Sequence, residues 1–285
     1  MFIFKRCKIM TRKFVLIAVL IVILGFSLAP LSVHVAQSQT GAMFKENIAE
    51  SSSTSLNWAG YVVTANSGSV YNVTGSWIIP TVDTSGNSYV AFWVGIDGYN
   101  DSTVEQTGIL AEPSGHGPHS TTIYEVWYEF YPAAPVYASF TASAGDYVYG
   151  WVSYSSITGE FTTHIAVYAS YPNSLIGTLT HTQSVTGALD NSAEWIVEAP
   201  SSTSGILPLA NFGTVYFGYD NTGISDTNSA TISGNTETMG YFSPIAITMV
   251  SSNGTPEATP SSISSDGTSF SVIYDQSVTS HGHSH

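Results

Sequence analysis

Apolar and polar residues alternate along most of the chain after about residue 55, and turn-forming residues separate the alternating stretches. A period of two places every second side chain on one face of an extended strand, so each stretch predicts a β-strand with one buried face. The strands predicted in this way are 57–64, 70–79, 89–97, 123–131, 147–154, 161–169, 193–198, 214–219, 245–250 and 270–274. No convincing helical period occurs in this part of the chain.

This many short strands in about 220 residues favours an all-β fold. We expect a two-sheet antiparallel β-sandwich of the jelly-roll, concanavalin-like kind, forming one domain over residues 56–276. Residues 277–285 contain three histidines at a spacing of two and are predicted to be a flexible tail. Since no acidic or cysteine ligand pattern accompanies these histidines, we predict neither a metal site nor a cofactor.

An apolar run at residues 14–29 follows a basic segment that holds five of the six lysines and arginines. A basic segment, an apolar run and a small-residue cleavage site are typical of a secretory signal peptide, which we predict over residues 1–38. The alternative is a retained membrane anchor, although the run is a little short and Pro30 follows it. Both interpretations export the domain, and residues 39–55 are predicted to be a short pro-segment or linker.

Charge narrows the possible partners. Only 9% of the residues are charged, against about a quarter in an average domain. Removal of residues 1–38 leaves twenty acidic residues against Lys45 alone, a formal charge of −19. That field repels nucleic acid and anionic membranes, so we predict neither as a partner.

Because the only cysteine, Cys7, leaves with the signal peptide, the mature domain has no disulfide or thiolate metal site. Unpaired carboxylates also predict higher stability at about pH 3 to 4 than at pH 7.

The segment SAEWIVEA contains two glutamates four positions apart, Glu194 and Glu198. On a strand these glutamates share one face, while Ala193, Trp195 and Val197 share the other and are expected in the core. The glutamates are therefore predicted to face the concave or solvent side of their sheet. At roughly 13 Å apart along the strand, they are too far from each other to form the close carboxylate pair of a retaining glycosidase. A catalytic partner has to come from a neighbouring strand.

Two other segments combine aromatic and acidic residues. Trp93 and Asp97 share a strand face in FWVGIDG, and Glu125, Trp127 and Glu129 share one in YEVWYEF. An open sheet face of this composition suits a groove for an extended polysaccharide or peptide. Taken singly, the tryptophans are equally typical of a core and Asp97 is typical of a turn.

Five motifs occur in the order NWAGYV (57–62), FWVGIDG (92–98) with QTG (106–108), VWYEFYP (126–132), SAEWIVEA (192–199) and PLANFGTVYF (208–217). At these motifs the sequence resembles the glutamic peptidases, the eqolisin family. The resemblance covers roughly residues 55–275. It implies a double seven-stranded antiparallel sandwich with an acid endopeptidase site on its concave sheet, acting on polypeptides without a metal or cofactor. We expect a secreted monomer without stable membrane association once the signal peptide is removed.

Matched motif to motif, the resemblance places the catalytic glutamine on Gln106 and the catalytic glutamate on Glu194. Glu194 would take a proton from a water molecule and return it to the leaving amine, while the Gln106 amide holds the water and stabilises the oxyanion. The residues predicted to line or support the site are Trp58, Trp93, Asp97, Tyr128 and Glu198. Strand parity alone does not separate Glu198 from Glu194; the motif match and its more central position favour Glu194.

Two other functions remain open from the sequence. A non-catalytic sandwich that binds carbohydrate or peptide would use the aromatic residues for stacking and the glutamates as hydrogen-bond acceptors. A glycosidase on a similar fold would need two carboxylates on adjacent strands, such as Glu129 and Glu194. Gln106 alone would pass as a surface loop residue, but within its full motif it favours the peptidase. The placement of Gln106 relative to Glu194 tests this interpretation.

Overall fold

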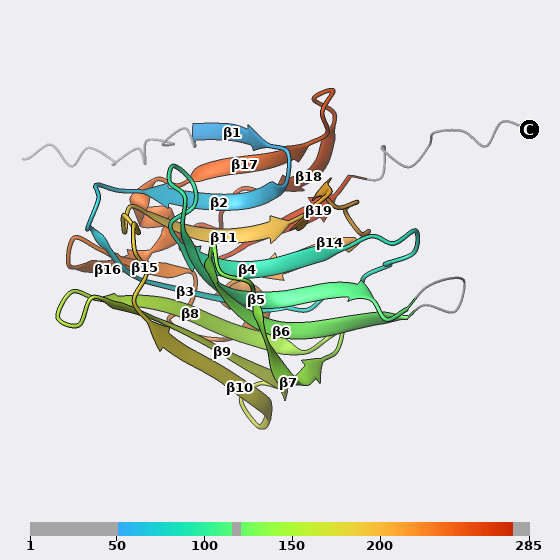
Figure 1. Cartoon of the computed structure of the whole chain (residues 1–285), viewed down its shortest axis with the longest axis horizontal. Helices are drawn as coiled ribbons and strands as arrows, with labels where there is room; N and C mark the ends of the chain where they lie inside the picture. Colours follow the sequence, from blue (N-terminus) through green and yellow to red (C-terminus); the bar gives the residue numbers. More distant parts are fainter. Residues whose placement is uncertain (1–50, 116–120, 276–285) are drawn as a thin grey trace, which may run out of the picture. The chain divides into compact units, whose positions relative to one another are not determined.

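The computed structural model describes residues 51–115 and 121–275, in which strands alternate with short turns (Figure 1). The predicted signal peptide, residues 39–50 and the tail at 277–285 lie outside the described residues. Only two short helices occur in the described part, α1 (Tyr219–Thr222) and the 3₁₀ helix η1 (Met239–Phe242). No helix among the described residues has the length and apolar character needed to cross a membrane.

One layer of the sandwich, called the front layer here, contains the glutamate strand, β11. Its strands are β1 (Ser51–Ser55), β2 (Trp58–Thr64), β4 (Val90–Ile96), β5 (Val104–Pro113), β6 (Thr122–Tyr131), β7 (Val136–Ala142), β11 (Ser192–Glu198) and β17 (Ile245–Val250). They pair in the order β7, β6, β5, β4, β11, β2, β17 and β1. All these pairings are antiparallel except that of β1 with β17. The glutamate strand therefore lies in the interior of the sheet.

The second layer, called the back layer, packs behind the first. Its strands are β3 (Val70–Ile78), β8 (Tyr147–Ser155), β9 (Glu160–Ser170), β10 (Ser174–Gln183), β14 (Thr214–Phe217), β15 (Ser229–Ile232), β16 (Asn235–Thr238), β18 (Pro256–Pro260) and β19 (Phe270–Tyr274). β10, β9, β8 and β3 pair in that order, and β3 continues to β15 and β14. β18 pairs with both β19 and β17, so the pairing runs from one layer into the other. β12 (Ser201–Ser202) and β13 (Gly205–Ile206) form a separate small hairpin.

The core lies between the layers and is built from alternate residues of each strand. On β11, Ala193, Trp195 and Val197 are completely buried there, as their parity predicts. The Trp195 indole Nε1 donates a hydrogen bond to the Thr74 carbonyl on β3, at 2.7 Å, which satisfies its one polar atom. Since the described residues include no lysine or arginine, apolar burial and backbone pairing stabilise this domain in place of ion pairs.

The all-β sandwich is confirmed, and each predicted strand occurs within two residues of its predicted ends. The strands that the pattern did not predict are β1, β5, β7, β10, β12, β13, β15, β16 and β18. β5 was missed because Glu105, Gln106 and Thr107, near its start, are polar yet buried. Three polar residues in a row show no alternation and are typical of a loop. β1 lies within the range predicted as pro-segment or linker, and it pairs with β17, so Ser51–Ser55 belong to the sheet. A polar edge strand carries no apolar alternation to detect.

Candidate active site

Register brings side chains from four strands of the front layer to one side of the sheet. Directly paired residues point the same way. Read from β11 through β4 and β5 to β6, the rows are Glu194, Gly95, Gln106 and Glu129; Ile196, Trp93, Gly108 and Trp127; and Glu198, Ala91, Leu110 and Glu125. β2 adds Trp58 beside Glu198. Gln106 and both glutamates of SAEWIVEA thus share the outward side of this layer.

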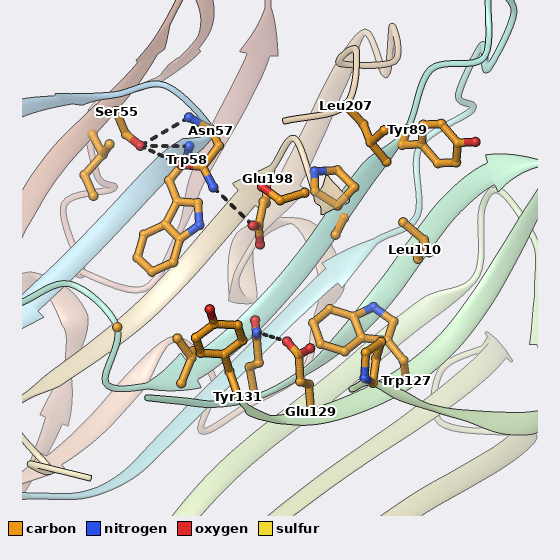
Figure 2. Close-up of a pocket in the computed structure, with 18 of the residues that line it drawn as sticks. Ser55, Asn57, Trp58, Tyr89, Leu110, Trp127, Glu129, Tyr131, Glu198 and Leu207 are labelled. Carbon is orange, nitrogen blue, oxygen red and sulfur yellow. Dashed lines mark hydrogen bonds between the residues drawn. The ribbon is translucent and has the colours of Figure 1, made fainter. Parts of the chain in front are cut away.

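An open pocket of about 710 Å³ lies on that side. Gln106, Glu129 and Glu198 line it together with the rings of Trp58 and Trp127. Figure 2 shows Glu198 and Glu129 on opposite sides of the pocket, with their carboxyl groups directed into the space between them. The pocket therefore combines amide and carboxyl groups between aromatic walls, the composition of a site that positions a polar reacting group.

Gln106 is held by Glu129 on the neighbouring strand. Its Nε2 donates to Glu129 Oε2 at 2.7 Å, while its Oε1 is buried without a hydrogen-bond partner. A Cβ at Gly95 would come within 3.2 Å of Gln106 Cβ and 3.0 Å of the Trp93 ring, so a larger residue there would press on both side chains. The amide is thus fixed in orientation and keeps a free acceptor for a bound water molecule.

Glu198 is half-buried at the end of β11 and is held by two donors. Trp93 Nε1 donates to one carboxyl oxygen at 2.8 Å, and Asn57 Nδ2 donates to the other at 3.2 Å. The Trp58 ring packs edge-on against Trp93 with ring centroids 5.0 Å apart. Burial raises the pKa of Glu198 to about 7, against the lowering effect of its donors, and the charge of Glu129 raises it further.

Burial likewise raises the pKa of Glu129 to about 7, although the hydrogen bond from Gln106 lowers it. Both carboxyl groups are therefore protonated at acid pH. A protonated carboxyl group has one O–H to donate and a second oxygen to accept. At acid pH the pocket can accordingly supply and receive protons without an ionised group.

Glu194 lies on the predicted face of β11 but does not reach the pocket. Its side chain has no exposed surface, and both carboxyl oxygens lack a hydrogen-bond partner. Burial raises its pKa well above the ordinary value, and the carboxyl groups of Asp97, Asp101 and Glu105 raise it further. Glu194 thus does not line the pocket. The expectation that both glutamates face the concave or solvent side of the sheet is corrected for Glu194, which is completely buried.

Tyr128 is also placed away from the pocket. It lies on the opposite side of β6 from Glu129, is 9% exposed and belongs to the core between the layers. Its ring stacks on His181 with centroids 4.7 Å apart and packs edge-on against Phe130. The prediction that Tyr128 lines the site is therefore corrected to a role in the core beneath β6.

Asp97 holds two segments of the site together by hydrogen bonds. It has a positive φ of 68° at the end of β4, and its carboxyl oxygens accept backbone N–H groups of Leu189, Asp190 and Asn191 at 2.7, 2.9 and 2.8 Å. These bonds tie the loop after β4 to the segment that enters β11. Asp97 thus positions two site strands relative to each other and does not line the pocket.

Replacing Asp97 by alanine should lower stability and activity together. Three backbone N–H groups, one buried and two partly buried, would lose their acceptor, at a cost of about 3 kcal/mol, and the loop that carries Gly98 beside Trp58 would shift. Thermal unfolding at about pH 5 should show a midpoint roughly 10 °C lower. The Asp97→Asn variant keeps one acceptor oxygen, so its thermal midpoint should lie between those of the parent and Asp97→Ala. An unchanged midpoint in both variants would contradict the positioning role.

The sequence predicts Glu129 on an open face suited to a groove, with a catalytic role only in the glycosidase alternative, and it predicts no individual role for Asn57. Both belong to the pocket through their hydrogen bonds to Gln106 and Glu198. Strand parity in YEVWYEF already placed Glu129 on an open face, but its contact with Gln106 depended on β5, which the pattern missed. Among the described residues, no group of three or more histidine, cysteine, aspartate or glutamate residues could hold a metal ion.

Comparisons with known proteins bear on this geometry. The model of the Peptidase A4 family matches residues 56–274. Aspergillopepsin-2 from Aspergillus niger is 33% identical over 190 residues, 57% of this chain and 62% of that protein, so the match spans less than two thirds of this relative's length.

Solved structures share the fold. A crystal structure of scytalido-glutamic peptidase with a peptide-based transition state analog superposes with a TM-score of 0.60 at 21% identity, covering 77% of this chain and 98% of that one. A member of the eqolisin family in a complex with a tripeptide gives a TM-score of 0.56 at 20% identity, with the same coverage. The aspergilloglutamic peptidase from Aspergillus niger gives 0.51 at 28% identity, covering 66% of this chain and 99% of that one.

Proposed function

Because this chain belongs to the Peptidase A4 family, we propose that it is a secreted endopeptidase that hydrolyses peptide bonds at acid pH with Gln106 and Glu198. The observation that carries the proposal is the convergence of Gln106, Glu129 and Glu198 in one open pocket. Glu198 takes the role that the motif match assigned to Glu194, because only Glu198 lines the pocket while the Glu194 carboxyl is buried.

The first step is the addition of water to the scissile carbonyl. A water molecule donates one hydrogen bond to Gln106 Oε1 and another to the unprotonated oxygen of the Glu198 carboxyl group. As the water oxygen attacks the carbonyl carbon, its proton passes to Glu198, and the proton already on Glu198 passes to the carbonyl oxygen. The product is a neutral tetrahedral diol, and the Gln106 amide N–H that Glu129 does not occupy stabilises the negative charge that develops on the way.

The second step breaks the carbon–nitrogen bond. Glu198 delivers its proton to the amide nitrogen and receives one from a hydroxyl group of the diol, so that a carboxylic acid and an amine leave the site. Glu198 is protonated before and after each step. Glu129 keeps Gln106 in its orientation throughout, since its carboxyl oxygen accepts the Nε2 hydrogen bond.

Acid action follows from the protonation state of Glu198. Its pKa of about 7 keeps the carboxyl group protonated through the acid range, and the proton is lost as pH rises through that value. The value of kcat/KM should therefore be nearly constant between about pH 4 and 6 and fall about tenfold per pH unit above 7. A profile that instead falls with decreasing pH below 6 would require an ionised carboxylate and contradict this mechanism.

Polypeptide substrates are supported by the relatives, whose structures hold a peptide-based transition state analog and a tripeptide. The aromatic walls and open ends of the pocket suit an extended chain rather than a small molecule. Acid pH also unfolds many proteins, which exposes the extended segments that such a groove accepts. We further propose export, a monomeric enzyme, and no nucleic-acid or metal partner, on the sequence features described above.

Digestion of an acid-unfolded protein at about pH 3.5 tests the function, with an inhibitor of aspartic peptidases and a metal chelator present. We expect internal cleavage, seen as defined peptides by mass spectrometry. Chromogenic glycosides at the same pH should remain intact. A folded, processed protein that binds peptides without cleaving them would favour the non-catalytic sandwich, and glycoside hydrolysis would assign the facing pair Glu129 and Glu198 to a glycosidase.

A further inference from the structure

The outward side of the back layer carries a row of aromatic residues that the proposed peptidase mechanism does not use. In the β8 sequence YVYGWVSYS, Val148 and Val152 point into the core, so Tyr147, Tyr149 and Trp151 point outward. Register extends the row across the sheet. Residues that share its outward side on β9 are His164, paired with Trp151, and Tyr168, paired with Tyr147.

These residues, with Tyr171 in the turn after β9, are called the back aromatic face here, whose members are Tyr147, Tyr149, Trp151, His164, Tyr168 and Tyr171. Trp151 stacks on His164 with ring centroids 5.2 Å apart and planes 19° from parallel. Tyr168 meets Tyr171 edge-on at 5.2 Å. The rings thus support one another, so the surface is ordered before any ligand binds.

Neighbouring segments leave this face open. The loop after α1 covers the outward side of β3, where Thr74 Oγ1 donates to the Asp226 carbonyl and Ser76 Oγ bonds with Thr222 Oγ1. On β8, in contrast, Tyr147, Tyr149 and Trp151 all retain partial exposure. Figure 1 shows β8, β9 and β10 as three adjacent strands at one side of the fold. Aromatic side chains left in water on a sheet face indicate a binding surface.

The face holds no acidic side chain of its own; burial and then the charge of Asp226, on the loop after α1, raise the pKa of Tyr149 at its edge. Burial lowers the pKa of His164, so its ring is neutral near pH 7, and its Nδ1 bonds with Thr180 Oγ1 at 2.6 Å. Threonine hydroxyls fill the outward positions beside it, with Thr162 and Thr182 bonded at 2.8 Å. Among the outward residues of β8, β9 and β10 the sole acidic one is Glu160, at the hairpin end. A neutral ligand with both apolar and hydroxyl surface therefore fits this face.

We propose that the back aromatic face binds a neutral polysaccharide built of pyranose rings. The C–H faces of such rings carry a slight positive charge and stack on the negative faces of aromatic rings, and the sugar hydroxyls meet the row of threonines. Outward residues on one strand repeat every 6.8 Å or so, which lets one extended chain contact Tyr147, Tyr149 and Trp151 in turn. Nucleic acid and anionic lipid are disfavoured because the protein carries no cation there.

The two binding surfaces lie on opposite sides of the sandwich. Gln106 and Glu198 project from the front layer away from the core, and Trp151 projects from the back layer in the other direction. A polysaccharide on the back face leaves the pocket accessible to peptides. The face thus anchors the enzyme to a polysaccharide matrix while it digests protein there.

Sedimentation with insoluble polysaccharides tests this proposal. The protein is mixed with microcrystalline cellulose, chitin or insoluble β-1,3-glucan, and the bound fraction is measured with and without the soluble form of the same glycan. We expect retention on at least one of the three, and a fall of at least tenfold in the Tyr149→Ala/Trp151→Ala double variant. The single variant Trp151→Phe should keep most of the parent's binding because phenylalanine retains a ring that can stack on a sugar.

The control is Tyr216→Ala, which removes a tyrosine that is 48% exposed on β14, outside the face. It should bind as the parent does. Melting temperature and kcat/KM on a soluble peptide show whether each variant is folded, and Tyr171→Ala, at a turn, is a second variant if the strand changes unfold the protein. Retention unchanged in folded variants, or no retention of the parent on any glycan, would overturn the proposal. A dimer that dissociates in the double variant would assign the face to a second copy instead.

Discussion

Replacing Glu198 by glutamine should reduce kcat/KM for peptide hydrolysis about a thousandfold or more, since loss of a general acid–base group costs roughly 10² to 10⁴. Glutamine keeps the size of the side chain, and its one carbonyl oxygen can still accept from Trp93 or from Asn57, which now donate to different oxygens of Glu198. It cannot pass a proton from water to the carbonyl oxygen. The measurement is the initial rate on a fluorogenic peptide at about pH 4, after thermal unfolding has shown that the variant is folded.

Glu194→Gln is the matched control, since it changes the other glutamate of the same strand. Glu194 is buried and protonated, so an amide of equal size should preserve both the fold and most of the activity. We expect kcat/KM within about threefold of the parent. The reverse result, an inactive Glu194 variant with an active Glu198 variant, would return the catalytic role to Glu194 and require a pocket that opens to it.

The free energy of unfolding should fall strongly as pH rises from about 5 to 9. Burial raises the pKa of Glu105 to about 9 and that of Glu194 well above its ordinary value. Burial also raises the pKa values of Asp101 and Asp190, each to about 6. Across this pH range the unfolded chain has released the protons of Glu105 and Glu194 while the folded chain still holds them, whereas Asp101 and Asp190 hold theirs only up to about pH 6. The folded state therefore binds more protons, and each of the two buried glutamates lowers the free energy of unfolding by about 1.4 kcal/mol per pH unit.

The effect is large because the buried carboxyl groups have no cation among the described residues to offset them. Two groups losing about 1.4 kcal/mol per unit would remove a large share of the roughly 5 to 15 kcal/mol that stabilises a domain. We expect the thermal midpoint to be highest near pH 4 and to fall by about 10 °C or more by pH 8. Differential scanning calorimetry in buffers of equal ionic strength measures it.

The variant Glu105→Gln/Glu194→Gln isolates the cause. Two amides that never ionise should leave stability at about pH 4 nearly unchanged and make the decline toward pH 8 shallower. A parent whose midpoint rises with pH would contradict the prediction. A decline of equal slope in parent and variant would place its origin in surface repulsion among the remaining carboxylates rather than in these two buried groups.

The alternation of apolar residues determined most of the architecture, because a strand buries every second side chain whatever its neighbours are. The all-β sandwich and the core face of β11 followed from it, and the glutamic peptidase resemblance carried by the five motifs is confirmed by the family match. Gln106 was selected by its motif and lines the pocket, as does Trp58. Trp93 contacts the site through the hydrogen bond that its indole N–H donates to Glu198.

Tertiary structure decided which glutamate meets solvent. Glu194 and Glu198 have the same parity and belong to the same motif, so no local pattern separates them. The loop after β4, which Asp97 holds by hydrogen bonds, places carboxyl groups near Glu194. Glu198, in contrast, lines the pocket. Burial of a side chain depends on segments distant in sequence that pack over it. For the same reason the contact of Gln106 with Glu129 required the pairing of β5 with β6, which the polar residues of β5 concealed.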